Sequence, residues 1–97
     1  MSHFVLSSRA QADLDGIWDY SAETWGIDQA ERYTRIIAEA INDMASKPTR
    51  GKSCDYIRDG YRKHPVGSHV LFYRLNGESI DVVRILHQQM DFERHMP

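Results

Sequence analysis

IRDGYRKHPVGSHVLFYRLNGESIDVVRILHQQMD, residues 57–91, is the stretch that decides the fold. Its three apolar segments, 61–66, 69–75 and 80–87, have the length of β-strands, and Asn76-Gly77 separates the last two. Asn-Gly between two such segments is the strongest short signal for a β-hairpin, because both residues tolerate positive φ. The nearly continuous Val, Ile and Leu run at 80–87 predicts a central strand. Pro65 lacks the N–H that a strand ladder needs, so it predicts that 61–66 is an edge strand or ends there.

The N-terminal half predicts two helices. In the first, Ser7 or Ser8 is the expected N-cap, and Ser8 with Gln11 has the capping-box spacing. Gly26 is expected to end this helix, and Gly16 inside it indicates a neighbouring backbone that approaches closely. The apolar face follows the helical period through Leu14, Ile17, Trp18, Ser21 and Trp25.

The second helix follows after a link of a few residues, which predicts an antiparallel helical hairpin. Asp28 and Glu31 repeat the capping-box spacing at its start, and Pro48 closes it. Trp and Met side chains on the two apolar faces are expected in the core. The second apolar face consists of Ala30, Tyr33, Ile37, Ile41 and Met44, with Ala40 and Ala45 beside them.

Together these elements predict an α+β domain that spans residues 1–97. A short strand at 4–6 precedes the helices, residues 49–56 form a loop, and a short helical turn begins near Asp91. The expected order is β-α-α-β-β-β, with the helical hairpin packed on a mainly antiparallel sheet of four strands. A chain of 97 residues has room for one such domain.

Composition narrows the class of protein. A hydrophobic content of 41% with 27% charged residues is ordinary for a globular domain. No apolar run approaches the roughly 18 residues that a membrane helix needs, and residues 1–4 do not resemble the start of a signal peptide. Cys54 is the single cysteine, so an internal disulfide is excluded. We therefore expect a cytoplasmic protein without a membrane association.

Charge is distributed unevenly along the chain. Residues 1–47 hold eight acids against four bases, whereas 50–74 hold six bases against two acids. This uneven charge allows two interpretations. The acidic and basic segments form solvated faces of opposite sign, or the basic segment forms a surface that binds an acidic partner or a phosphate backbone. Direct DNA binding is not expected, because the net charge is -2 and no helix has a basic face.

Candidate chemistry centres on the basic strands. Ribonucleolysis needs a base, an acid and cations for the phosphate, and His87 is the natural acid or base. No carboxylate base accompanies the basic strands, so a ribonuclease is the minority interpretation. His87 would equally serve to end the last strand by bonding a backbone carbonyl or a nearby acid. If the chain were a ribonuclease, its catalytic residues would be Arg58, Arg62, Arg84 and His87.

Arg74 and Arg84 allow two interpretations. Asp81, Asp59 or Glu78 would neutralise them in one, and in the other they face a groove that an acidic partner fills.

Metal and cofactor sites are not expected. The five histidines lack metal-binding spacing, and Cys54 lacks an adjacent activating base. His64 and His69 flank the 65–68 turn, where a solvated loop explains them. No glycine-rich loop is present to hold a phosphate.

An ordered series of residues gives the chain a family resemblance. It resembles the ParE toxins of the RelE/ParE superfamily, which are the toxic halves of type II toxin–antitoxin pairs. The series runs through Leu6-Ser7, Ala10, Ala12-Asp13-Leu14, Ile17-Trp18, Tyr20, Trp25-Gly26, Gln29-Ala30, Tyr33, Pro48, Gly51, Ile57-Arg58, Gly60-Tyr61-Arg62, Gly67-Ser68-His69, Phe72-Tyr73-Arg74, Val83-Arg84-Ile85-Leu86-His87 and Met90-Asp91.

The resemblance implies a stoichiometric inhibitor of DNA gyrase without enzymatic activity, neutralised by a ParD-like antitoxin in a hetero-oligomer. RelE relatives instead cut messenger RNA on the ribosome, and the fold alone does not separate the two activities. We expect the antitoxin to cover an apolar groove along the helical hairpin and the basic side of the sheet. The candidate residues for binding antitoxin or target are Trp18, Trp25, Arg58, Tyr61, Arg62, Arg74, Arg84 and His87.

Overall fold

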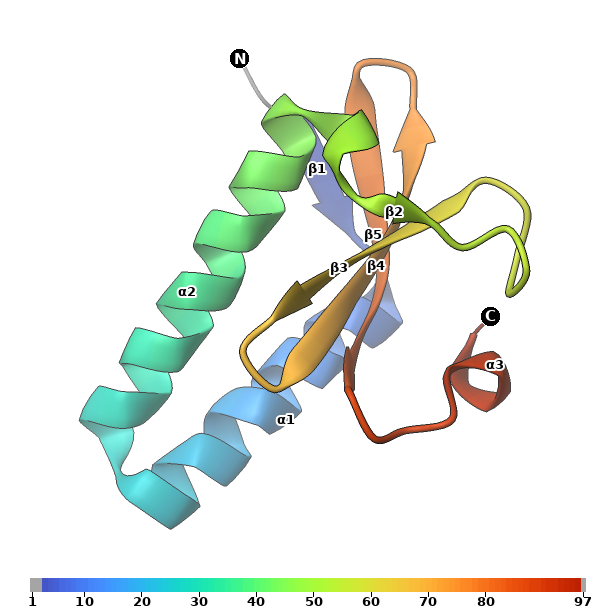
Figure 1. The fold of residues 1–97 in the computed structure, drawn as a ribbon. Coiled ribbons are helices and arrows are strands. Elements are labelled where there is room, and N and C mark those ends of the chain that lie inside the picture. The colour runs from blue at the N-terminus through green and yellow to red at the C-terminus, as the bar shows by residue number, and fades with distance from the viewer. Residues whose placement is uncertain (1–2, 97) are drawn as a thin grey trace.

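The computed structural model describes residues 3–96, and Figure 1 shows two long helices beside a twisted sheet. A mixed sheet runs in the order β1-β5-β4-β3-β2, with β1 parallel to β5 and the other pairs antiparallel. The elements are β1 (His3–Leu6), α1 (Ser8–Trp25), α2 (Ile27–Ser46), the 3₁₀ turn η1 (Pro48–Arg50), β2 (Lys52–Ser53), β3 (Tyr61–Val66), β4 (His69–Asn76), β5 (Ser79–His87) and α3 (Phe92–His95).

The expected α+β architecture is confirmed, with one correction to the sheet. β5 is an interior strand between β1 and β4, as its apolar run predicts, and Gly77 turns the hairpin with a φ of 63°. The sheet has five strands instead of four, because β2 lies inside the segment expected to be a loop. β2 pairs with Lys63 and Arg62 alone, so Pro65 lies beyond it on the outer edge of β3. β2 has only two residues, so the sequence shows no alternation of apolar and polar positions that would have predicted it.

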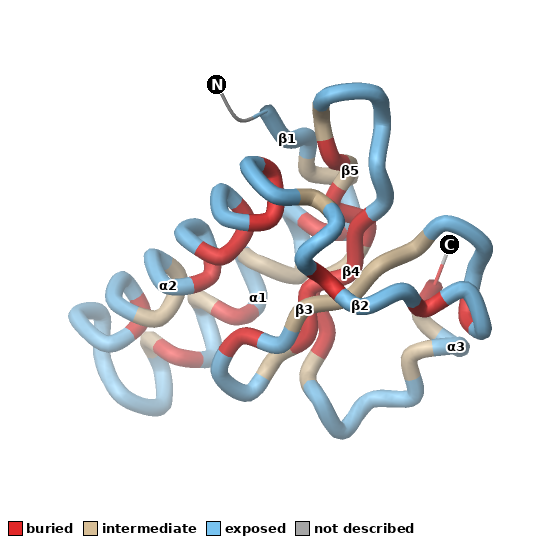
Figure 2. The backbone as a smooth tube through the Cα atoms, turned by 45° about the horizontal axis from the view of Figure 1, so that its top comes forward, coloured by how far each residue is buried: buried red, intermediate tan, exposed pale blue. Residues whose placement is uncertain are grey.

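Both faces of the sheet are covered. α1 and α2 pack on one face, and the 54–60 loop and α3 lie over the other (Figure 1). Figure 2 shows buried and exposed positions alternating along α2, as its amphipathic period requires. The helical-side core includes Ile37, Ile41, Met44, Leu71, Tyr73, Ile80, Val82 and Ile85, and the smaller core on the other face includes Cys54, Ile57, Val70, Phe72, Leu86 and Met96.

The helix starts differ from the predicted capping boxes. Ser7 is the N-cap of α1: its Oγ accepts from the Ala10 N–H at 3.0 Å and donates to the Val83 carbonyl at 2.9 Å. Ser8 already belongs to the helix, so its capping box with Gln11 is wrong. Gly26, with a φ of 97°, both ends α1 and begins α2, which leaves Asp28 in the first turn without a capping role. Asp28 still lies at the helix end where negative charge is favourable.

Two expectations about α1 are also wrong. Trp25 was expected in the core, but 63% of it is exposed at the tip of the hairpin, whereas Trp18 is half-buried. Gly16 was expected to meet a neighbouring backbone, but a Cβ built there would find no atom within 4 Å. Gly16 instead faces an open groove.

α1 is fastened to β5 by an ion pair. Arg84 donates from Nε and Nη2 to the two carboxylate oxygens of Asp13, each at 2.8 Å, and the Ile85 N–H donates to Asp13 Oδ2 at 2.9 Å. The Arg84 and Asp13 side chains are 12% and 15% exposed. Arg84 Nη1 also donates to the His95 carbonyl, so one guanidinium joins α1, β5 and the C-terminal segment. Hydrogen bonding to Asp13 raises the pKa of Arg84, which keeps it charged.

A tyrosine fixes the turn that precedes β2. Tyr73 Oη donates to the Pro48 carbonyl at 2.6 Å and accepts from the Gly51 N–H at 3.0 Å. A Cβ at residue 51 would overlap the Tyr73 ring and approach the Lys63 carbonyl at 3.0 Å. Glycine is therefore required at 51, and this close approach sets the position of β2.

We expect Asp13→Ala to lower the free energy of unfolding by about 3 kcal/mol, because it leaves the mostly buried charge of Arg84 without its partner. Asp15→Ala is the matched control: Asp15 is exposed on the same helix and accepts only from the Gln11 side chain. Its substitution should change stability by no more than about 0.5 kcal/mol. Urea denaturation measures both values, and equal small effects would contradict a structural role for the pair.

Candidate functional site

A groove of about 930 Å³ lies between the helical hairpin and the ends of β4 and β5. α1 forms one wall, the first turns of α2 form a second, and the segment that follows β5 closes the third. We call it the hairpin groove. It is lined by Ala12, Asp13, Gly16, Ile17, Tyr20, Ser21, Trp25, Gln29, Tyr33, Ser68, His69, Ile85, Leu86, His87 and Met90.

A polar cluster lies in the hairpin groove. Tyr33 Oη is 2.6 Å from His69 Nδ1 and accepts from the Ser68 N–H at 3.0 Å. His69 and His87 are cross-strand partners on β4 and β5, and their rings meet edge to face with centroids 5.4 Å apart. His87 is the last residue of β5, as expected, but its Nδ1 accepts from the Gln89 N–H at 3.2 Å instead of bonding the expected carbonyl or acid.

His69 was expected in a solvated turn, and this expectation is wrong. The half-buried ring packs against the Tyr33 ring at a tilt of 53°, with centroids 5.6 Å apart. Burial lowers the pKa of His69 below 6.5, and the nearby positive charge of His87 lowers it further, against a smaller opposing effect of Asp13. The neutral imidazole is therefore favoured in the folded protein.

Aromatic side chains mark the open end of the hairpin groove. Tyr20 and Trp25 are both 63% exposed and touch edge to face, with ring centroids 5.8 Å apart. Two more apolar side chains are exposed in this region. Met90 lines the groove, and Ile27 follows Trp25 closely in the chain. Large aromatic side chains held in this way are typical anchors of protein–protein interfaces.

A second, smaller cavity lies on the basic side of the sheet. It measures about 320 Å³, and we call it the basic cavity. Lys63 Nζ is 2.7 Å from Tyr56 Oη, and among residues 3–96 no ion pair neutralises Arg50, Lys52 or Lys63. The basic cavity is lined by Arg50, Lys52, Lys63, His64, Pro65, Val70 and Phe92.

Two predicted arginines have carboxylate partners. Arg84 is bound by Asp13, which was not among the three acids considered, so its assignment to an open docking groove is wrong. Arg74 pairs with Asp81, one of the expected neutralising acids, at 3.2 Å, and 55% of its side chain stays exposed.

The other predicted binding residues of the β3 region are held by the protein itself. Arg62 Nη1 donates to the Thr49 and Gly51 carbonyls at 3.2 and 2.6 Å. Arg58 donates to the Ile57 carbonyl at 2.8 Å, and Tyr61 is half-buried against the smaller core.

The four residues that a ribonuclease would need are not gathered in one cavity. His87 lines the hairpin groove, but Arg58, Arg62 and Arg84 line neither that groove nor the basic cavity. Within residues 3–96, no group of three or more His, Cys, Asp or Glu side chains is placed to hold a metal ion. In the same range, no helix is long and apolar enough to cross a bilayer.

Comparison with known proteins gives consistent matches. The family described as ParE toxin of type II toxin–antitoxin system, parDE, matches residues 4–92. Toxin ParE1 of Mycobacterium tuberculosis (strain H37Rv) is 53% identical over 98% of both chains, and Toxin ParE1 of Caulobacter vibrioides is 43% identical over 99% of both. A chain from the chromosomal ParDE TA system from P. aeruginosa shares the fold, with a TM-score of 0.77 at 22% identity over 90% of this chain and 96% of that one.

We expect His87→Asn to raise the pKa of His69, because it removes the neighbouring positive charge while leaving the burial in place. Titration of the imidazole signals by NMR measures this. The folded protein takes up a proton at His69 less readily than the unfolded chain, so stability should also fall as the pH drops below about 6.5. An unchanged His69 pKa in the variant would show that the two rings do not interact.

Proposed function

The chain belongs to the ParE toxin family of type II toxin–antitoxin systems, and from this premise we propose that it inhibits DNA gyrase by binding it. A ParD-like antitoxin neutralises it by forming a hetero-oligomer, and both events take place in the cytoplasm. One observation carries the proposal for this chain. Its two described cavities are a groove with exposed aromatic side chains and a basic cavity, and neither combines the acid, the base and the cations that ribonucleolysis needs.

Binding accounts for the site residues better than cutting does. A ribonuclease needs cations at the phosphate beside its acid and base. The histidine pair in the hairpin groove has Asp13 as its charged neighbour, and Arg84 is already held by that carboxylate. A phosphate would therefore meet no Lys or Arg among the lining residues. The protein acts as a stoichiometric inhibitor and not as an enzyme.

The basic cavity is the surface on which the acidic segment of the antitoxin docks. Arg50, Lys52 and Lys63 carry positive charge there without an ion-pair partner among the described residues. Arg74 is close by in the sheet, since it pairs with Tyr61 across β3 and β4, and its side chain remains half-exposed. Carboxylates of an extended antitoxin segment would satisfy these cations and fix its register.

We expect the purified toxin at equimolar ratio to reduce DNA supercoiling by gyrase, and the antitoxin added beforehand to restore it. A supercoiling assay on relaxed plasmid measures both effects. Unaffected supercoiling at equimolar dose would overturn the gyrase assignment.

Primer extension on translated mRNA tests the alternative: site-specific cuts that disappear in His87→Ala would establish a ribosome-dependent mRNA interferase.

We expect the double variant Lys52→Glu/Lys63→Glu to weaken antitoxin binding about tenfold or more, because it replaces attraction by repulsion at two points of the basic cavity. These residues are cleaner probes than Arg62, whose guanidinium also holds the Thr49 and Gly51 carbonyls. Lys47→Glu is the control, since Lys47 is exposed and lies outside the cavity lining. Calorimetric titration would refute the assignment if the double variant and the control bound equally well.

A further inference from the structure

The histidine pair of the hairpin groove has polar atoms that the fold itself does not bind. Nδ1 of His69 lies 2.6 Å from Tyr33 Oη. Nδ1 of His87 accepts from the Gln89 N–H at 3.2 Å. Within residues 3–96, Nε2 makes no hydrogen bond in either ring. Both rings line the groove, so these two nitrogens are available to the molecule that fills it.

The internal bonds determine which nitrogen carries the proton in each neutral ring. A backbone N–H can only donate, so Nδ1 of His87 carries no proton and its Nε2 does. Tyr33 has one proton for two acceptors, which are His69 Nδ1 at 2.6 Å and the Val66 carbonyl at 3.5 Å. The proton belongs to the short bond, because 3.5 Å is at the limit of hydrogen bonding, and Nδ1 of His69 therefore accepts as well. Each neutral ring thus presents an N–H at Nε2.

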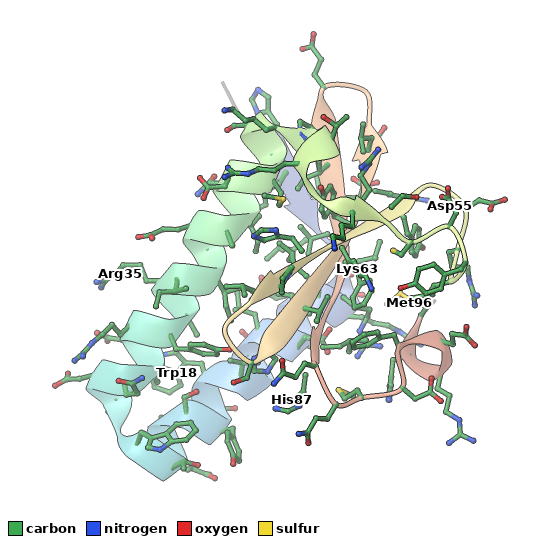
Figure 3. All side chains as sticks on the ribbon, viewed as in Figure 1. Trp18, Arg35, Asp55, Lys63, His87 and Met96 are labelled. Carbon is green, nitrogen blue, oxygen red and sulfur yellow. The ribbon has the colours of Figure 1, made fainter. Side chains whose placement is uncertain are left out.

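Strand pairing brings these two N–H groups to the same part of the hairpin groove. His69 and His87 are cross-strand partners on β4 and β5, with ring centroids 5.4 Å apart. Figure 3 shows His87 where β5 ends, away from Lys63 of the basic cavity. A carbonyl oxygen has two lone pairs, so one such oxygen held between the rings can accept from both N–H groups.

The charges around the histidine pair favour an uncharged oxygen over a carboxylate. The titratable groups that face His69 are Tyr33 of α2, His87 of β5 and Asp13 of α1. Asp13 is already paired with Arg84, and the groove lining contains no Lys or Arg. Burial lowers the pKa of His69, which favours its neutral form. A carboxylate at this point would be buried without a cation, which is costly, whereas a carbonyl oxygen needs only the two N–H groups.

The position of the basic cavity indicates which partner supplies this oxygen. Pro65 lines the basic cavity and Ser68 lines the hairpin groove, and both belong to the turn between β3 and β4. A chain whose acidic segment lies on the basic cavity can therefore continue across this turn into the groove. The apolar floor, with Ile17, Ile85 and Leu86, then receives apolar side chains of the same chain.

We propose that His69 and His87 determine which antitoxins the groove accepts, because their Nε2–H groups bind an uncharged oxygen such as the side-chain carbonyl of an Asn or Gln. This rests on the proposed function, in which a ParD-like antitoxin neutralises the protein. An antitoxin without an acceptor at this point would bury two N–H groups unpaired. A mismatch of that kind discriminates between partners more strongly than the loss of one apolar contact.

The test uses pairs of substitutions in the full-length protein that separate the two nitrogens of each ring. Asn places its amide near the position of Nδ1, so His69→Asn and His87→Asn keep the internal bonds and lose the Nε2 donor. Gln reaches the position of Nε2, so His69→Gln and His87→Gln keep the donor and lose the internal bonds. His3→Asn is the control, because His3 is exposed on β1 and lines neither cavity. Calorimetric titration with the antitoxin measures each affinity, and thermal unfolding shows that each variant is folded.

We expect each Asn variant to bind the antitoxin about tenfold more weakly than wild type, as for the loss of one hydrogen bond at a buried contact. Each Gln variant should bind within about threefold of wild type, because the donor to the antitoxin is retained. The Gln variants should nevertheless unfold at a lower temperature than the Asn variants, since they lose the internal bonds. The control should behave as wild type in both measurements.

Three outcomes would overturn the inference and leave the proposed function intact. Asn variants that bind like wild type would show that Nε2 does not contact the antitoxin. Gln variants that lose as much affinity as the Asn variants would show that the rings act only through their internal bonds. A wild-type affinity that rises relative to the Gln variants as the pH is lowered from about 8 to about 6 would assign a carboxylate to the site. If the wild-type protein does not bind the antitoxin at all, the failure lies in the proposed function.

Discussion

The ion pair between Asp13 and Arg84 is the interaction on which the rest of the arrangement depends. The Arg84 guanidinium donates to both carboxylate oxygens of Asp13, and the Ile85 N–H donates to one of them as well. These bonds fix α1 against β5 at the point where Ile85, Leu86 and His87 enter the floor of the hairpin groove. The remaining N–H of Arg84 reaches the His95 carbonyl and holds the C-terminal segment over the other face. A single arginine thus joins α1, β5 and the C-terminal segment.

Much of the fold could be predicted from local patterns, and the departures have physical causes. The Asn76-Gly77 hairpin, the central apolar strand and the two amphipathic helices follow from turn chemistry and periodicity. Arg84 was singled out as a docking residue because its partner, Asp13, is 71 positions away and no local pattern joins the two. Trp25 falls on the apolar period of α1 but lies at the last helical residue, beyond the reach of the sheet.

A register shift in the hairpin explains why the polar cluster of the groove was missed. From Asn76↔Ser79 to Tyr73↔Val82 the pairing is regular, and a bulge between Phe72 and Tyr73 then moves it by one residue. Without the bulge, His69 would face Leu86; with it, His69 faces His87 and both rings reach the groove. Bulges of this kind have no dependable signal in a single sequence. The uneven charge, by contrast, was visible in the sequence, but the cavities that it surrounds depend on tertiary structure.

The two cavities described above differ in their lining: one is basic, and the other is apolar and aromatic with a histidine pair. Under the proposed function, the basic cavity is the surface on which an acidic segment of the antitoxin docks. Hydrogen exchange of the protein, free and bound to the antitoxin, tests this assignment most directly. The antitoxin should protect the amides of residues 50–66, which include most of the basic cavity lining. Unchanged exchange across residues 50–66 in the complex would contradict it.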